Sequence, residues 1–278
     1  MPELPEVEVI RRGLEPLLCG QRVIGLGWSN RKLRLPIPRK ALQRWVKGER
    51  VRAVGRRAKY LLIHMANNAT VVVHLGMSGR LGIFPGTAPR SKHDHLRLLL
   101  DNDMELRFND TRRFGSLQVI GPEAGLDDLF AAIGPEPLAD DFSPAYLLSM
   151  AQNRRQPVKN FLMDSRVVAG IGNIYANEIL FCAGICPTTP AGDLSKTQWQ
   201  ETVHCCRQVL QRAIASGGTT IADFVGASGS AGYFQLQLQV YGRGQEKCNR
   251  CKSAITRLVL AGRATYFCPC CQSSTASR

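Results

Sequence analysis

The sequence has no long hydrophobic run and few acidic side chains for its 278 residues. Its longest apolar stretches, such as 60–63 and 71–73, are far shorter than the roughly 20 residues of a membrane-spanning helix. The first six residues are acidic and contain no apolar core of the kind that a secretory signal requires. The sequence shows no internal repeat. We therefore expect no membrane association and a cytoplasmic location.

The shortage of acidic residues leaves the chain strongly basic. Asp and Glu number 22 against 36 Lys and Arg, which gives a formal net charge of +14. Each phosphate that a basic side chain neutralises releases condensed counterions, so such a chain favours a polyanionic partner. Charge alone fits a ribosomal protein as well as a DNA-binding protein.

Hydrophobic spacing predicts an α+β chain with several domains. Val7, Ile10, Leu14 and Leu17 recur at helical steps, and Gly20 is placed to end that helix. Between residues 22 and 120 the pattern changes to short apolar runs separated by turn residues, which is typical of a β-sandwich. These runs cover 51–54, 60–64, 70–75, 96–100, 105–108 and 116–120.

The second half returns to helical spacing. Residues 121–144 are rich in Gly, Pro and Asp and are predicted to form a linker. Helices are expected at 146–151, 173–183 and 195–215, with loops at 217–220 and 226–232. We therefore expect an N-terminal domain over 1–133, a linker and helical domain over 134–235, and a cysteine-bearing module over 236–278.

Four of the ten cysteines have the spacing of a zinc site. Cys248, Cys251, Cys268 and Cys271 form two C-x₂-C pairs, which allow four thiolates to face one tetrahedral ion. The stretch between the pairs can fold as a hairpin around Ala261 and Gly262. Four thiolates leave no open coordination position, so we expect one structural Zn²⁺. The alternative is four unrelated buried cysteines.

The remaining cysteines lack metal spacing. Cys270 lies directly beside a ligand, and adjacent side chains do not easily turn inward together, which favours Cys268 and Cys271 as the second pair. Unpaired thiols that serve as small core residues are the expectation for the other five: Cys19, Cys182, Cys186, Cys205 and Cys206.

Short motifs follow one another along the whole chain. They are PELPEVE at 2–8, RRAKY at 56–60, HLGMSG at 74–79, RRFG at 112–115, GIGNIY at 170–175, GGTT at 217–220, VYGR at 240–243 and the cysteine module. This ordered set resembles the formamidopyrimidine-DNA glycosylase family. The sister group of endonuclease VIII-like enzymes usually has Gly where this chain has Leu4, and that difference, with Met77 and residues 112–114 present, favours the purine-directed branch.

The resemblance implies an N-terminal β-sandwich led by a catalytic helix, a helix–two-turn–helix domain and a zinc hairpin. It also implies that Pro2, once Met1 is removed, is the nucleophile, because a secondary amine forms a cationic iminium with the sugar. Glu3 would supply a proton, Glu6 would assist, and Lys59 and Arg263 would serve the elimination steps. Read alone, Pro2 and Glu3 suit a helix start, and Lys59 and Arg263 suit solvated surface charges.

The resemblance further implies contacts with a DNA duplex from which the damaged nucleotide is flipped. Met77, Arg112 and Phe114 would fill the resulting gap, although Met77 and Phe114 could equally be core residues. Thr111 stands where the family usually has proline, which predicts a slightly looser loop. Phosphate contacts are expected from His93, Arg112, Arg155, Asn173 and Arg263.

The function that follows is removal of oxidised purines from damaged double-stranded DNA, and then strand cleavage at the abasic site. We expect a monomer associated with the nucleoid, and a loop at 217–232 that covers the flipped base. Two alternatives remain at this stage. One is an endonuclease VIII-like glycosylase for oxidised pyrimidines, and the other is a non-catalytic zinc protein that binds nucleic acid.

Overall fold

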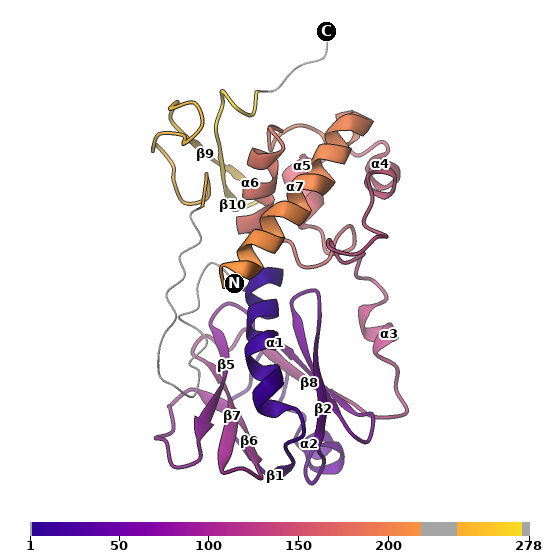
Figure 1. Cartoon of the computed structure of the whole chain (residues 1–278), viewed down its shortest axis with the longest axis vertical. Helices are drawn as coiled ribbons and strands as arrows, with labels where there is room; N and C mark the ends of the chain where they lie inside the picture. The colour runs from indigo at the N-terminus through magenta and orange to yellow at the C-terminus, as the bar shows by residue number, and fades with distance from the viewer. Residues whose placement is uncertain (1, 218–237, 274–278) are drawn as a thin grey trace. The chain divides into compact units, whose positions relative to one another are not determined.

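The structure is a computed structural model that describes residues 2–217 and 238–273 (Figure 1). Residues 2–131 belong to one compact unit, and residues 132–215 with 238–273 belong to a second. Apart from Gly217, the loops expected at 217–220 and 226–232 lie outside the described residues. Within the described ranges, no helix is long and apolar enough to cross a membrane.

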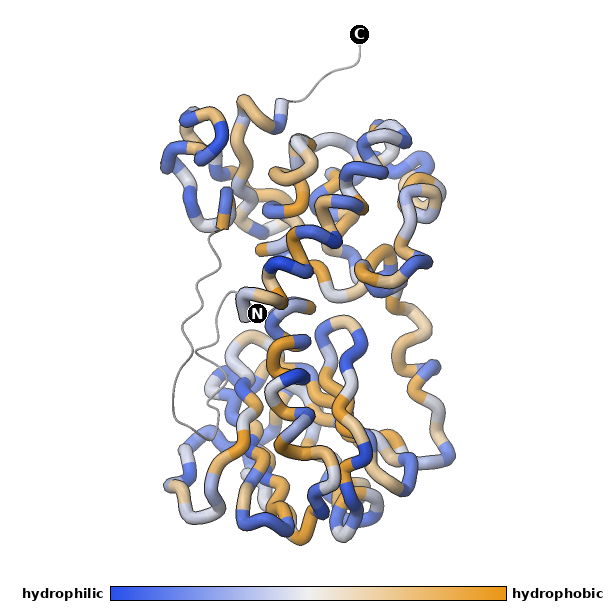
Figure 2. Tube along the Cα trace, in the orientation of Figure 1, coloured by the Kyte–Doolittle hydropathy of each residue, from blue (hydrophilic) through white to orange (hydrophobic). Residues whose placement is uncertain are grey.

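The first unit begins with helix α1 (Leu4–Leu18). Pro5 lies in its first turn, where the missing amide hydrogen costs no helical bond, and Glu6 stabilises the positive end of the helix dipole. From Val7 onward its buried residues follow helical spacing, and the helix in Figure 2 alternates between hydrophobic and hydrophilic stretches. The helix ends before Gly20, whose φ of 85° suits glycine. The predicted helix is thus confirmed.

Two four-stranded antiparallel sheets follow, so the predicted β-sandwich is confirmed. One sheet has the order β1-β6-β7-β5, built from Val23–Trp28, Asp94–Leu100, Met104–Asp110 and Gly79–Pro85. The other has the order β2-β3-β4-β8, built from Val51–Arg57, Tyr60–Met65, Thr70–His74 and Ser116–Ile120. Leu61, Val73, Leu98 and Phe108 are among the side chains buried in their shared core, on which α1 also packs.

Sequence spacing missed β1, β5 and the short helix α2 (Arg39–Trp45). Both strands contain glycine, which weakens an alternating pattern and often marks close approach of a neighbour. A Cβ at Gly27 in β1, for example, would meet the guanidinium of Arg97. The stretch predicted as a linker also holds one short helix, α3 (Leu126–Phe130).

The second unit contains a helical core. Its elements are α4 (Pro144–Ala151), α5 (Val158–Met163), α6 (Asn173–Cys182), the 3₁₀ turn η1 (Ala191–Asp193) and α7 (Lys196–Ala215). The three longer helices lie where spacing predicted them, whereas α5 is too short to give a periodic signal. Phe161, Tyr175 and Trp199 are fully buried between them.

The hairpin of the second unit consists of β9 (Thr256–Leu260) and β10 (Arg263–Phe267). Leu260 pairs with Arg263, so Ala261 and Gly262 form a two-residue turn, as predicted. Both turn residues have positive φ, 46° and 73°, which matches the twist that a tight hairpin needs. The hairpin's small core includes Phe181 from α6.

The expectation of unpaired thiols is wrong for two of the five cysteines. Cys182 at the end of α6 and Cys205 in α7 form a disulfide, with their Cα atoms 5.7 Å apart. Packing of α6 against α7 brings the two residues together, and a sequence separation of 23 residues gives no spacing signal for it. Cys186 and Cys206 are buried free thiols, as expected, and Cys19 is partly buried.

Candidate active site and metal centre

The start of α1 places two carboxyl groups beside Pro2. Glu3 is 2% exposed and Glu6 is 8% exposed, although both belong to a class of side chain that is usually solvated. The backbone N–H of Glu3 donates to Glu6 Oε2 at 2.8 Å and so completes part of a capping box. The residue that directly follows Pro2 therefore carries a buried carboxyl group.

Lys59 occupies the tight turn between β2 and β3. Arg57 pairs with Tyr60, so Ala58 and Lys59 are the two turn residues, and Ala58 has a φ of 52°. A positive φ is uncommon for alanine and costs roughly 1–3 kcal/mol, so the surroundings must hold this conformation. The turn thereby presents Lys59 at one end of the sheet.

His74 lies opposite Tyr60 in the neighbouring strand β4, with ring centroids 4.9 Å apart. Burial, and then the nearby positive charges of Arg34 and Lys59, lower the pKa of His74 from 6.5 to about 4. The N–H of Gly76 lies 3.1 Å from Nδ1, which fits a neutral ring that accepts at this nitrogen. Arg34 and Lys59 thus lie near an imidazole that burial and their charges keep neutral.

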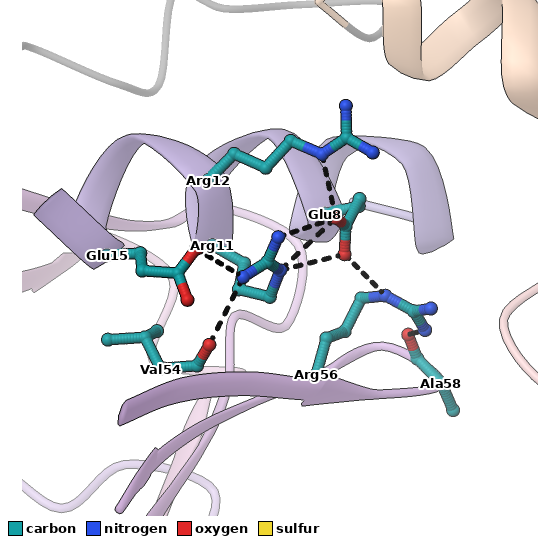
Figure 3. Close-up of polar contacts among 7 residues, drawn as sticks. All are labelled: Glu8, Arg11, Arg12, Glu15, Val54, Arg56 and Ala58. Atoms are coloured by element: carbon teal, nitrogen blue, oxygen red, sulfur yellow. Dashed lines mark hydrogen bonds and ion pairs between the residues drawn. The ribbon is translucent and has the colours of Figure 1, made fainter. Parts of the chain in front are cut away.

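Glu8 joins α1 to β2 (Figure 3). Its carboxylate accepts from Arg11 and Arg12 on its own helix and from Arg56 Nε on β2 at 3.2 Å. Burial acts to raise the pKa of Glu8, but hydrogen bonds from Arg11 and Arg12 and the charges of Arg11 and Arg56 outweigh it. The pKa is therefore lowered from its ordinary 4.5.

Met77 lies on the loop between β4 and β5, and Arg112 and Phe114 lie on the adjoining loop between β7 and β8. Ser78 Oγ donates to Asp110 Oδ1 at 2.6 Å and accepts from the Arg112 N–H at 3.0 Å, which ties one loop to the other. Met77 and Phe114 are each 47% exposed. The core alternative for these two side chains is therefore wrong.

Hydrogen bonds and one cation–π contact hold the loop that contains Phe114. Asp110 Oδ2 accepts from the Gly115 N–H at 2.8 Å, and the Asp110 carbonyl lies 2.9 Å from His95 Nε2. The Arg112 guanidinium stacks on the Phe114 ring, 4.8 Å from its centroid. These contacts hold the loop on which Arg112 and Phe114 lie.

His93 is half-buried just before β6, and its carbonyl accepts from the Asp110 N–H at 3.1 Å. The loop that leads to it is held by buried Arg107, which donates to the carbonyls of Pro85, Ala88 and Pro89 at 3.3, 2.8 and 2.8 Å. His93 is therefore placed by an ordered loop rather than by a strand.

In the second unit, Asn173 and Arg263 lie close together although they are 90 positions apart. Asn173 is the first residue of α6, and its Nδ2 donates to the carbonyl of Ala264 at 3.0 Å. Asn177, one turn later, donates to the Asn173 carbonyl and accepts from the Tyr266 N–H at 2.7 Å. The helix start and the hairpin tip are thus joined.

Two further buried charges hold the hairpin module, and sequence spacing gave no sign of either. Lys159 in α5 is 0% exposed, and its Nζ donates to Thr265 Oγ1 at 2.8 Å and to the Ala264 carbonyl at 3.3 Å. Glu178 in α6 accepts from the backbone N–H groups of residues 239–241 at 2.8–2.9 Å.

Arg155, one of the predicted phosphate contacts, is exposed in the segment between α4 and α5.

The four predicted metal ligands meet at one point. The sulfur atoms of Cys248, Cys251, Cys268 and Cys271 all lie within 4.8 Å of one another. The separations between Cys248 and Cys271 and between Cys251 and Cys268 are 3.9 and 3.4 Å. A tetrahedron with Zn–S bonds of about 2.3 Å has sulfur–sulfur edges of roughly 3.8 Å, so these residues fit one Zn²⁺. A zinc ion bound by these four residues would supply folding energy to the hairpin.

Comparison with known proteins assigns the chain to a class of DNA glycosylases that carry a zinc finger. Residues 1–117 match the formamidopyrimidine-DNA glycosylase N-terminal domain, residues 133–225 match the H2TH domain of the same enzymes, and residues 245–273 match the zinc finger found in FPG and IleRS. The matches occur in this order and cover most of the chain.

Relatives that match over nearly their whole length are enzymes of the same class. The chain is 46% identical over 272 residues to a formamidopyrimidine-DNA glycosylase of Hahella chejuensis, covering 98% of this chain and 100% of the relative. It is 48% identical over 273 residues to one of Shewanella loihica, covering 98% and 99%. The chain belongs to the formamidopyrimidine-DNA glycosylase family.

Solved structures of similar fold include complexes with damaged DNA. Lactococcus lactis Fpg with DNA containing N7-benzyl-Fapy-dG has a TM-score of 0.88 and 35% identity, covering 98% of this chain and 100% of that one. The same enzyme with DNA containing an oxidised pyrimidine has a TM-score of 0.87 and 34% identity, with the same coverage.

Proposed function

We propose that this protein is a base excision repair enzyme. It removes oxidised purines, such as 8-oxoguanine and formamidopyrimidines, from double-stranded DNA and then cleaves the strand by β,δ-elimination. The observation that carries the proposal is the buried carboxyl of Glu3 directly after Pro2 at the start of α1. Binding alone would not require an acid to be buried beside the N-terminal imino group, whereas amine-dependent base removal requires a proton donor there.

The reaction follows from these groups. After removal of Met1, the Pro2 nitrogen attacks the sugar carbon C1′, and the glycosidic electron pair leaves with the base. Glu3, with Glu6 assisting, donates a proton to the ring oxygen O4′ as the C1′–O4′ bond breaks, the Pro2 nitrogen loses its N–H proton, and an iminium forms between Pro2 and C1′. Loss of a C2′ proton then expels the 3′ phosphate, and a second elimination expels the 5′ phosphate. Lys59 serves the first elimination and Arg263 the second.

The substrate is bound by two groups of residues. Met77, Arg112 and Phe114 fill the gap left by the flipped nucleotide, because their side chains are exposed on adjoining loops. The phosphate contacts come from residues of both units: His93, Arg112, Arg155, Asn173 and Arg263. The protein acts as a monomer in the cytoplasm, associated with the nucleoid. Its functional domains are 1–133, 134–235 and 236–278.

Borohydride trapping tests the nucleophile directly. The reductant should lock the protein to a lesion-bearing strand, and peptide mapping should place the adduct on Pro2 with Met1 absent. A variant that retains residues ahead of Pro2 should bind DNA but neither trap nor cleave, because an amide nitrogen has no usable lone pair. Full trapping by that variant, with the adduct on Lys59, would contradict the proposal.

Oxidised pyrimidines are a second candidate substrate class. The L. lactis relative has been solved with DNA that contains an oxidised pyrimidine. Single-turnover excision on matched duplexes that carry 8-oxoguanine or an oxidised pyrimidine compares the two classes, and we expect the purine to be released faster. Binding to both duplexes without excision or trapping would instead indicate a non-catalytic DNA-binding protein.

A further inference from the structure

The contact between α1 and β2 contains a cluster of charged side chains. The carboxylate of Glu8 accepts from three arginines, two on its own helix and one on the neighbouring strand. The side chains of Glu8 and Arg56 are only 13% and 11% exposed. An exposed pair contributes little, whereas a pair withdrawn from water is costly to break because one charge is then left uncompensated.

Arg56 connects Glu8 to the turn that contains Lys59. Its Nε donates to Glu8, and its Nη1 donates to the carbonyl of Ala58 at 2.9 Å. Ala58 is the turn residue with positive φ, and its carbonyl belongs to the peptide group that leads into Lys59. A single planar guanidinium therefore connects the helix to the strained residue of the turn.

Arg11 provides a second attachment between the same two elements. Its Nη1 donates to the Val54 carbonyl of β2 at 3.3 Å and to Glu15 Oε2 at 2.8 Å, while its Nε and Nη2 face Glu8 (Figure 3). The helix is thus attached to β2 at two places along the strand. Sliding of α1 would have to break both attachments.

We propose that Glu8 is a positioning residue: through Arg56 it sets the place of the Lys59 turn relative to the Pro2–Glu3 end of α1. The inference rests on the proposed function, in which Pro2 and Lys59 act on the same sugar and its phosphate. Misplacing one reacting group by about 1 Å can slow a reaction roughly 100-fold. Glu8 itself does not touch DNA, because its carboxylate is already occupied by three guanidinium groups.

The kinetic test is a double-mutant cycle of Glu8→Gln and Arg56→Met. Each single variant should slow single-turnover excision by about 10- to 100-fold, and the double variant should be no slower than either one. The dissociation constant for lesion DNA should change by less than about threefold, because neither Glu8 nor Arg56 is among the residues proposed to contact phosphate. If the two slowing factors multiply in the double variant, Glu8 and Arg56 act independently and the proposal is wrong.

Two matched variants separate positioning from simple charge or helix stability. Glu15→Gln removes another acidic partner of Arg11 on the same helix and leaves the Glu8–Arg56 contact in place, so excision should stay within about twofold of the wild-type rate. Arg56→Lys keeps the charge but loses the planar two-pronged geometry, so it should be as slow as Arg56→Met. If Glu8→Gln and Glu15→Gln slow excision equally, Glu8 only stabilises the helix and the proposal is wrong.

Amide hydrogen exchange measures the same effect without any substrate. Exchange at Lys59 and Tyr60 should accelerate at least tenfold in Glu8→Gln and remain unchanged in Glu15→Gln. Unchanged exchange in both variants would overturn the proposal even if the enzyme is active. Absence of excision and trapping by the wild-type protein would instead overturn the proposed function, and the exchange result would still decide whether Glu8 holds the turn.

Discussion

Acidification should destabilise the first unit through His74. The pKa of this buried histidine is lowered from 6.5 to about 4, by burial first and then by the charges of Arg34 and Lys59. The unfolded chain therefore takes up a proton near pH 6.5, whereas the folded chain resists it until about pH 4. Stability from this residue is complete above pH 6.5 and is lost as the pH falls toward 4. The difference corresponds to about 3 kcal/mol.

The measurement compares the pH dependence of urea unfolding in the wild type and in His74→Asn. The Asn amide oxygen can still accept from the Gly76 N–H, but it does not titrate in this range. His64, whose pKa is also lowered by burial and by Arg52, is present in both proteins, so its contribution cancels. The wild type should lose about 3 kcal/mol more than the variant between pH 7 and pH 4.

An NMR titration of the His74 ring supplies an independent check. The ring should remain neutral at pH 5, with Nδ1 as the acceptor. Parallel pH profiles for the two proteins, or a ring that titrates at pH 6 or above, would refute the reasoning. Either result would mean that the neighbouring cations and the burial do not hold the imidazole neutral.

Three further predictions concern the second unit. Cys248→Ser should release zinc and unfold the hairpin while the first unit keeps its stability; wild-type protein without zinc in a metal analysis would contradict this. Arg155→Ala and Arg263→Ala should each lower the slope of log K against log salt by about one, and unchanged slopes would mean no phosphate contact. Glu178→Gln should lower the free energy of unfolding by about 1–3 kcal/mol, because three backbone N–H groups lose a charged acceptor; an unchanged urea midpoint would contradict it.

Local patterns predicted those parts of the fold that depend on neighbouring residues. The first helix, six of the eight sandwich strands and the zinc hairpin follow from spacing and turn residues within short windows. Strand β1 was missed because Gly25 and Gly27 interrupt its alternation, and a Cβ at these positions would meet Leu99 and Arg97 of the neighbouring strand β6. Such neighbours are unknown until the strands are paired.

The side chains that act through other residues could not be predicted for the same reason. Glu8 and Arg56 are 48 positions apart, and Lys159 meets Thr265 across 106 positions. A buried lysine or an interhelical disulfide such as Cys182–Cys205 carries no periodic signal. Family motifs predicted which residues contact the DNA, whereas the charged side chains that hold their loops and turns became visible only with the fold.

The small core of the zinc hairpin has a consequence for protein engineering. Phe181 of α6 contributes a side chain to that core, and Gln272 Nε2 donates a hydrogen bond to the Ile185 carbonyl at 2.8 Å. A graft of residues 245–273 alone would therefore leave an apolar surface open and several polar groups without partners. A transplantable unit has to include α5 and α6, so the metal-binding segment and the helices that carry Lys159 and Asn177 must be exchanged together.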